Sequence, residues 1–211
     1  MSRFFSMDSG LVRFLTRLAD LVILNLLFLI CSLPIFTIGA SWTALYYVTL
    51  KMVRDEESYI VRSFFRSFRQ NFRQATLLWL GVLLFAGVMA VDFRILAPMS
   101  GMPITVLRVA LMAMCFFAIL VLLYLFPVLS KFYNTVPNTL RNAILMSIRH
   151  FPMTIVMLIV PAAAAVGTFF NSYTFAHSIP LWILAGFSLI ALMNSWFLVR
   201  IFDKYIDSEN V

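Results

Sequence analysis

Long blocks of apolar residues, separated by short basic stretches, run along the whole chain. Most blocks approach the ~20 apolar residues that a helix needs to cross the hydrocarbon core of a bilayer. Six helical segments are predicted, at about residues 14–33, 40–54, 75–96, 104–130, 153–171 and 180–202. The pattern therefore predicts an all-α transmembrane helix bundle of about six spans.

The first two segments are predicted to form a short hairpin. Pro34, which cannot continue a helical hydrogen-bond ladder, and Gly39, which permits a turn, lie between them. The second segment is short, and its sequence fits either a full crossing or a re-entrant or interfacial helix.

Two polar connections have a helical periodicity of their own. Between residues 58 and 74, arginines and phenylalanines recur at steps of three and four residues, so they form two stripes of one amphipathic helix. The stripes are Arg62, Arg66, Arg69 and Arg73 on one side and Phe65, Phe68 and Phe72 on the other. The second connection has a similar stripe between Leu140 and Phe151, with Asn138 as the expected N-cap. Both helices are predicted to lie along the cytoplasmic interface.

Composition supports membrane insertion of the whole chain as a single domain, residues 1–211. Apolar residues make up 63% and charged residues 12%, whereas a soluble domain has about 45–50% and about 25%. With the N-terminus inside, 14 of the 16 Lys and Arg residues fall in cytoplasmic segments, as the positive-inside rule requires. Both termini are therefore predicted to be cytoplasmic. The net charge of +7 is explained by this orientation, and no nucleic-acid partner is expected.

Catalytic and metal-binding motifs are not found. Cys31 and Cys115 lie inside apolar blocks, and the only histidines are His150 and His177. These are too few and too far apart for a typical metal site. We expect a non-enzymatic protein with no cofactor.

Asp20 is the most informative acidic residue, because it lies within or at the edge of the first segment. A charged group at the centre of a span costs about 2.5–3.5 kcal/mol and usually has a partner or a role. The hairpin would bring Asp20 to the depth of Lys51 and Arg54, and Arg17 lies three residues before it. We expect an intramembrane ion pair with one of these cations; a proton or substrate site is the alternative.

Other polar residues allow two interpretations each. Asn25 and Asn194 either hydrogen-bond between helices or bind a solute. Asp92 and Arg94, at the outer end of the third segment, either line an entry together with Arg108 or form a solvated interface pair. The arginine stripe either binds anionic lipid headgroups, at about 1 kcal/mol per residue, or docks onto another protein.

Four runs, at residues 31–39, 44–47, 54–57 and 65–72, resemble the YesL-like family of bacterial integral membrane proteins. They include the CSLPIFTIG sequence of the hairpin turn and the FRSFRQNF sequence of the arginine stripe. The resemblance implies a Firmicutes source, the bacterial cell membrane and genes placed beside carbohydrate ABC importers; it implies no biochemical activity. We therefore expect an accessory or scaffold protein associated with importer subunits. The alternative is a small solute transporter or channel that acts as a homo-oligomer.

Overall fold

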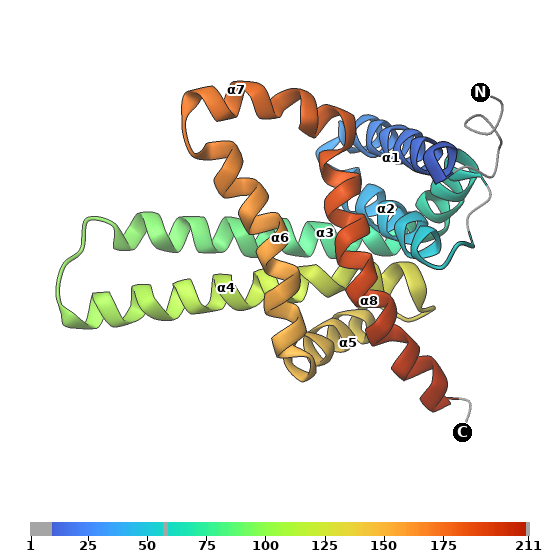
Figure 1. Ribbon diagram of the computed structural model, residues 1–211. Coiled ribbons are helices and arrows are strands. Elements are labelled where there is room, and N and C mark those ends of the chain that lie inside the picture. Colours follow the sequence, from blue (N-terminus) through green and yellow to red (C-terminus); the bar gives the residue numbers. More distant parts are fainter. Residues whose placement is uncertain (1–9, 57–58, 210–211) are drawn as a thin grey trace.

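The computed structural model describes residues 10–56 and 59–209, and every regular element in them is helical (Figure 1). This confirms the all-α prediction. Five helical stretches are long and apolar enough to cross a membrane: Leu11–Ser32, Ile60–Leu96, Met102–Lys131, Phe151–Phe169 and Ser172–Ile206. They correspond to the first, third, fourth, fifth and sixth predicted segments.

The second predicted segment is α2, Ile38–Val53, and it differs from the other five. Its 16 residues extend for about 24 Å at 1.5 Å per residue, which is less than the ~30 Å hydrocarbon core. Most of its side chains are buried, because α2 packs against α1, α3, α4 and α8. The second segment is therefore a short, enclosed helix at the centre of the molecule.

The turn before α2 contains Pro34, as the sequence predicts, but not Gly39. Helix α1, Gly10–Ser32, is followed by one 3₁₀ turn, η1, Ile35–Thr37. The Thr37 hydroxyl donates hydrogen bonds to the carbonyls of Cys31 and Pro34, at 2.6 and 2.7 Å. Gly39 lies inside α2 and not in the turn. A Cβ atom there would lie 2.6 Å from the Ala75 carbonyl oxygen, so this glycine permits α2 and α3 to approach closely.

The first amphipathic helix is not a separate element, contrary to the prediction. It is the beginning of α3, a continuous helix of 37 residues, Ile60–Leu96, which is about 55 Å long. No proline or glycine lies between Ile60 and Leu80. The change from an amphipathic to an almost wholly apolar surface therefore occurs without a break in the backbone.

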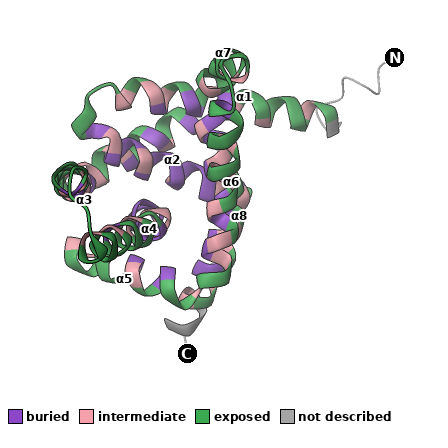
Figure 2. Ribbon diagram, turned by 90° about the vertical axis from the view of Figure 1, so that its left-hand side faces the viewer, coloured by how far each residue is buried: buried purple, intermediate pink, exposed green. Residues whose placement is uncertain are grey.

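Helices α3 and α4, Met102–Lys131, form a long hairpin whose outer half projects from the body (Figure 1). Only a small cluster, Met89, Leu96 and Leu111, is buried in that outer half. Viewed along this hairpin, α6, Phe151–Phe169, and α8, Phe187–Glu209, run across its direction (Figure 2). The long helices thus pack around α2 without being parallel.

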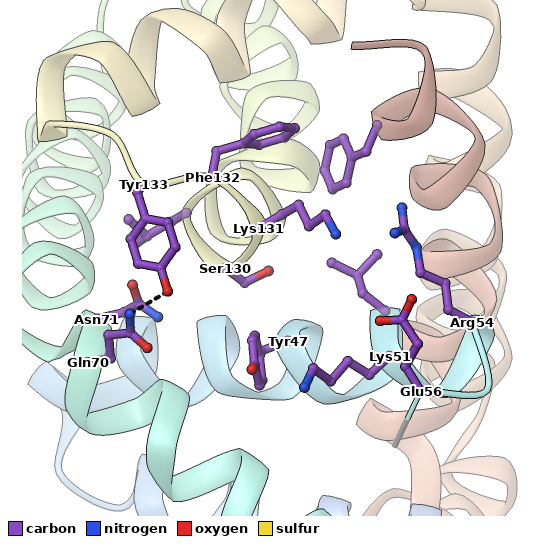
Figure 3. A pocket seen from close by; sticks show the side chains of 13 residues that line it. Tyr47, Lys51, Arg54, Glu56, Gln70, Asn71, Ser130, Lys131, Phe132 and Tyr133 are labelled. Atoms are coloured by element: carbon purple, nitrogen blue, oxygen red, sulfur yellow. Dashed lines mark hydrogen bonds between the residues drawn. The ribbon is translucent and has the colours of Figure 1, made fainter. Parts of the chain in front are cut away.

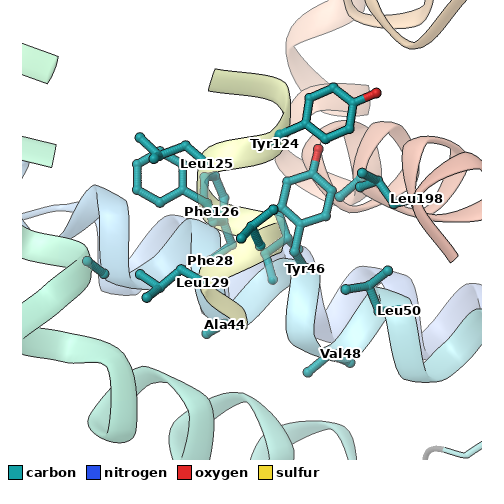
Figure 4. Packing of buried hydrophobic residues seen from close by; sticks show 14 of the residues in the cluster. Phe28, Ala44, Tyr46, Val48, Leu50, Tyr124, Leu125, Phe126, Leu129 and Leu198 are labelled. Carbon is teal, nitrogen blue, oxygen red and sulfur yellow. The ribbon is translucent and has the colours of Figure 1, made fainter. Parts of the chain in front are cut away.

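The main core surrounds α2. Tyr46 of α2, Tyr124 and Phe126 of α4, and Leu198 of α8 are each at most 3% exposed, and the two tyrosine rings lie close to Leu198 (Figure 4). This core joins segments far apart in the sequence.

The remaining helices connect these long elements. Helix α5, Val136–Arg149, begins after Thr135 with a proline in its first turn, so Asn138 is not its N-cap. Helix α7, Ser172–Leu181, begins at a capping box formed by Asn171 and Thr174. A π-helical turn, η2, Trp182–Gly186, joins α7 to α8, and α7 lies across the ends of α6 and α8 (Figure 1).

Candidate functional site

Asp20 does not form the expected ion pair with Lys51 or Arg54. Arg54 pairs with Asp203 of α8, and the Lys51 ammonium lies 4.8 Å from the centre of the Tyr47 ring. The cation that interacts electrostatically with Asp20 is Arg17. The C-terminal end of α2 does approach α1, but the cations there have other partners: Asp203 for Arg54 and the Tyr47 ring for Lys51.

Helix ends and connections from four parts of the chain meet on one side of the molecule, which we call the basic end. Arg17 of α1 pairs with Asp55 after α2, and Arg54 pairs with Asp203 of α8. Three neutral contacts join the rest: Gln70 donates to the Tyr133 hydroxyl at 2.8 Å, Gln74 donates to the Asn134 carbonyl at 3.1 Å, and His150 lies 3.2 Å from the Tyr205 hydroxyl. The segments that the charge pattern places on one side of the membrane are therefore in contact.

A cavity of about 170 Å³ opens at the basic end. Figure 3 shows Lys51 and Arg54 from α2, Lys131 from the end of α4, and Glu56 directed towards it. Its remaining walls are polar on the α3 side and apolar beneath α8. The sequence indicated Lys51 and Arg54 as functional candidates, but with a different partner, and it gave no reason to single out Lys131.

A wider groove of about 820 Å³ adjoins this cavity, between α3 and the connection from α4 to α5. Arg69 and Arg73 line it on one side, and Tyr133, Asn134 and Thr135 on the other. The two hollows share Gln70, Asn71, Phe132 and Tyr133. The C-terminal half of the arginine stripe therefore borders a concave surface.

The arginine stripe faces outward, as predicted. All four of its members, Arg62, Arg66, Arg69 and Arg73, are exposed. Their side chains are thus available to headgroups, water or a partner.

The phenylalanine stripe is divided between core and surface. Phe68 and Phe72 pack against the main core, whereas Phe65 is 40% exposed. The fully buried residue on this face is Phe64, whose ring stacks on Phe68 with centroids 6.2 Å apart. Phe64 lies four residues before Phe68 and so belongs to the same helical face, but the predicted stripe began at Phe65 and left it out.

The apolar stripe of α5 is divided: Ile144 packs against the main core, whereas its other members in α5 are turned away from it. Leu140, Leu145 and Ile148 are 42–55% exposed, while the core-facing positions are Thr139, Ala143, Met146 and Ser147. An apolar face next to exposed basic residues, here Arg141 and Arg149, is typical of a helix in the membrane interface.

Asn25 joins α1 to the π-helical turn. Its amide nitrogen donates to the carbonyls of Trp182 and Ile183, at 2.9 and 2.7 Å, and its amide oxygen accepts from the Ser188 backbone N–H at 3.1 Å. A π-helical turn interrupts the regular hydrogen-bond ladder, and Asn25 satisfies the groups that this interruption leaves. Of the two interpretations, the structure supports helix packing for this residue.

Two other polar pairs join helices in the core. Thr49 of α2 and Ser195 of α8 are 2.8 Å apart, and Tyr124 of α4 and Thr154 of α6 are 2.9 Å apart. Asn194 is different: it is 1% exposed, and neither atom of its amide has a hydrogen-bond partner among the described residues.

Arg108 has a structural role at the outer turn. Its guanidinium donates to the carbonyls of Leu96, Ala97 and Met99, which lie at and just beyond the end of α3. Cations stabilise helix C-termini in this way, so its contacts are those of a cap.

His150 lies between α5 and α6, outside the membrane-spanning stretches. Burial lowers the pKa of its imidazole, and the nearby cations Lys204 and Arg149 lower it further. The neutral imidazole is therefore favoured in the folded protein.

Residues 21–93 match the model of a family described as a protein of unknown function, DUF624. The match covers the end of α1, the turn, α2 and most of α3, and so includes Lys51, Arg54 and the arginine stripe. No curated protein and no solved structure matches the chain. The chain is thus similar, over about a third of its length, to a family without an assigned function.

Proposed function

We propose that the protein is a non-enzymatic, multi-pass accessory or scaffold protein of the bacterial cell membrane. Its basic end would face the cytoplasm and bind another membrane complex. The YesL-like resemblance favours subunits of a carbohydrate ABC importer, in a Firmicutes host, as that complex.

The proposal rests on one observation: polar side chains in the core form hydrogen bonds from one helix to another. Asn25, Thr49, Ser195, Tyr124 and Thr154 form helix–helix hydrogen bonds. Polar groups that line a solute path must remain available to the solute. Polar groups used in helix packing instead support a static, structural body.

The basic end supplies the surface for a partner. The exposed arginines of α3 and the groove beside Arg69 and Arg73 lie there. The contacts between Arg17 and Asp55, and between Arg54 and Asp203, connect segments that the positive-inside rule assigns to the cytoplasm. This supports cytoplasmic termini and a single basic surface on that side.

Affinity purification of the full-length protein from native membranes in mild detergent tests the proposal. We expect importer subunits at a fixed ratio with the wild-type protein. Changing Arg62, Arg66, Arg69 and Arg73 to Gln should release them. The Arg141→Gln, Arg149→Gln variant of α5 is the control for loss of positive charge, and it should retain them. A homo-oligomer that purifies without any other subunit would contradict the proposal.

A small transporter or channel acting as a homo-oligomer is the second candidate function. It is favoured by Asn194, whose buried amide lies near the Tyr46 hydroxyl but makes no hydrogen bond of normal geometry with any described residue. An unpaired buried amide costs about 1–3 kcal/mol, and such a cost is tolerated where a ligand completes the site. Solute uptake by proteoliposomes that is lost in Asn194→Leu would establish this alternative.

A further inference from the structure

Like charges converge on the 170 Å³ cavity at the basic end (Figure 3). Three cationic side chains line it: Lys51, Arg54 and Lys131. Only Arg54 has an ion pair, with Asp203. Within the described residues, no carboxylate oxygen lies within 4.0 Å of the Lys51 or Lys131 ammonium.

A role as helix caps accounts for only part of this arrangement. Lys51 and Lys131 each lie in the last turn of a helix, where a cation stabilises the helix dipole by about 0.3–1 kcal/mol. That role is fulfilled by a side chain that extends into solvent. Here, Arg54 and, more weakly, Lys51 repel the Lys131 ammonium, while Glu56 and Asp203 attract it. Glu56 and Asp203 offset only two of the three charges.

The cavity has the size and lining of a site for a phosphate group. Its volume is about ten times what one water molecule requires. Lysine binds phosphate as a point charge, and the side chains of Gln70 and Asn71 lie on the α3 wall. On the opposite side, Phe132 and Phe202 form an apolar wall, against which the carbon atoms of a ligand can pack.

We propose that this cavity binds a phosphate group, carried by an anionic phospholipid headgroup or by a soluble phosphate. Lys51 and Lys131 are its direct ligands, and the Arg54–Asp203 pair holds α2 and α8 in place around it. The bound anion removes the repulsion between the cations. This site is independent of the arginine stripe and of the proposed scaffold role.

The test is a binding measurement on the full-length protein with two probes. Purified protein in a neutral detergent is titrated with phosphatidylglycerol, followed by native mass spectrometry, and with inorganic phosphate at pH 7, followed by thermal denaturation. The test variant is Lys51→Met, Lys131→Met. Lys204→Met, an exposed lysine outside the cavity, is the matched control. Lys51→Arg, Lys131→Arg keeps the charges.

We expect the double Met variant to bind about 10–100-fold more weakly, which corresponds to about 1.4–2.8 kcal/mol at 1.4 kcal/mol per tenfold. The affinities of Lys204→Met and of the Arg variant should remain within about threefold of wild type. That difference is smaller than the tenfold change that corresponds to 1.4 kcal/mol. Without any anion, the double Met variant should melt no lower than wild type, since the repulsion is gone. A lower melting temperature without anion, together with unchanged binding, would show that the lysines are only helix caps and overturn the proposal.

The two probes also distinguish the sources of the phosphate. Binding of phosphatidylglycerol without stabilisation by inorganic phosphate assigns the site to a lipid headgroup. Stabilisation by inorganic phosphate, with competition against the lipid, assigns it to a soluble phosphate. An equal loss of binding in Lys204→Met would show that surface charge alone attracts the anion, and no binding of either probe would equally refute the site.

Discussion

Replacing Asn25 by Leu should destabilise the protein by disconnecting α1 from the π-helical turn. The change removes three hydrogen bonds, to Trp182, Ile183 and Ser188, in a side chain that is fully buried. Polar contacts between membrane helices contribute about 0.6 kcal/mol on average and at most about 1.7 kcal/mol each. The expected loss is therefore about 2 kcal/mol, with an upper bound of about 5 kcal/mol.

Unfolding of the purified protein in mixed micelles, followed by circular dichroism, measures this loss. Leu has the same branched side-chain skeleton as Asn, with bulkier methyl groups in place of the amide, so the change leaves no cavity. Asn138→Leu, at an exposed position in the first turn of α5, is the control and should stay within about 0.5 kcal/mol of wild type. If Asn25→Leu also stays within that range, the π-helical turn does not depend on Asn25, and our explanation of this residue is wrong.

Three further predictions follow from the packing and the basic end. Gly39→Ala should destabilise by about 1–3 kcal/mol in the same assay, because its Cβ would lie 2.6 Å from the Ala75 carbonyl oxygen; Gly81→Ala, where no atom lies within 4 Å, should be neutral or slightly stabilising, and equal effects would refute the close approach. The pKa of His150 is lowered in the folded protein, so the unfolded chain binds the proton more readily, and stability should fall as the pH drops from about 7.5 to about 5. His150→Gln should reduce the slope of stability against pH, and an unchanged slope would contradict the role of His150. In a variant without Cys31 and Cys115, single cysteines that replace Ser100 or Ser178 should react with an impermeant reagent added outside. A cysteine that replaces Ser208 should not react, since the positive-inside rule places the C-terminus in the cytoplasm. Labelling of residue 208 from outside would show the opposite orientation.

The apolar blocks and the helical periodicity of the sequence predicted most of the fold. The apolar blocks gave five of the helices, since length and hydropathy suffice to identify a span. Pro34 indicated the turn because proline lacks an N–H and often ends a helix, but proline alone is not decisive, since Pro127 and Pro161 lie inside α4 and α6. The outward direction of Arg62, Arg66, Arg69 and Arg73 also followed from periodicity alone.

Features that depend on tertiary contacts were not predictable in the same way. The continuity of α3 was missed because a change in polarity resembles a boundary, although helix propensity does not change there. The partner of Arg54 was missed because Asp203 lies 149 residues away. The convergence of Lys51 and Lys131 likewise depends on how α2 and α4 pack, and no local pattern encodes it. The π-helical turn has no sequence signal that we can identify beyond Gly186, whose Cβ would contact the Trp182 ring.

Photocrosslinking in native membranes tests the central claim, that the basic end binds a protein partner, most directly. A photoreactive phenylalanine analogue is placed at Arg66, which is exposed on the basic half of α3, or at Leu84, which is 72% exposed on its apolar half. We predict a discrete protein adduct from position 66, identified as an importer subunit by mass spectrometry, and no protein adduct from position 84. No protein adduct from position 66, or adducts only between copies of this chain, would contradict the account.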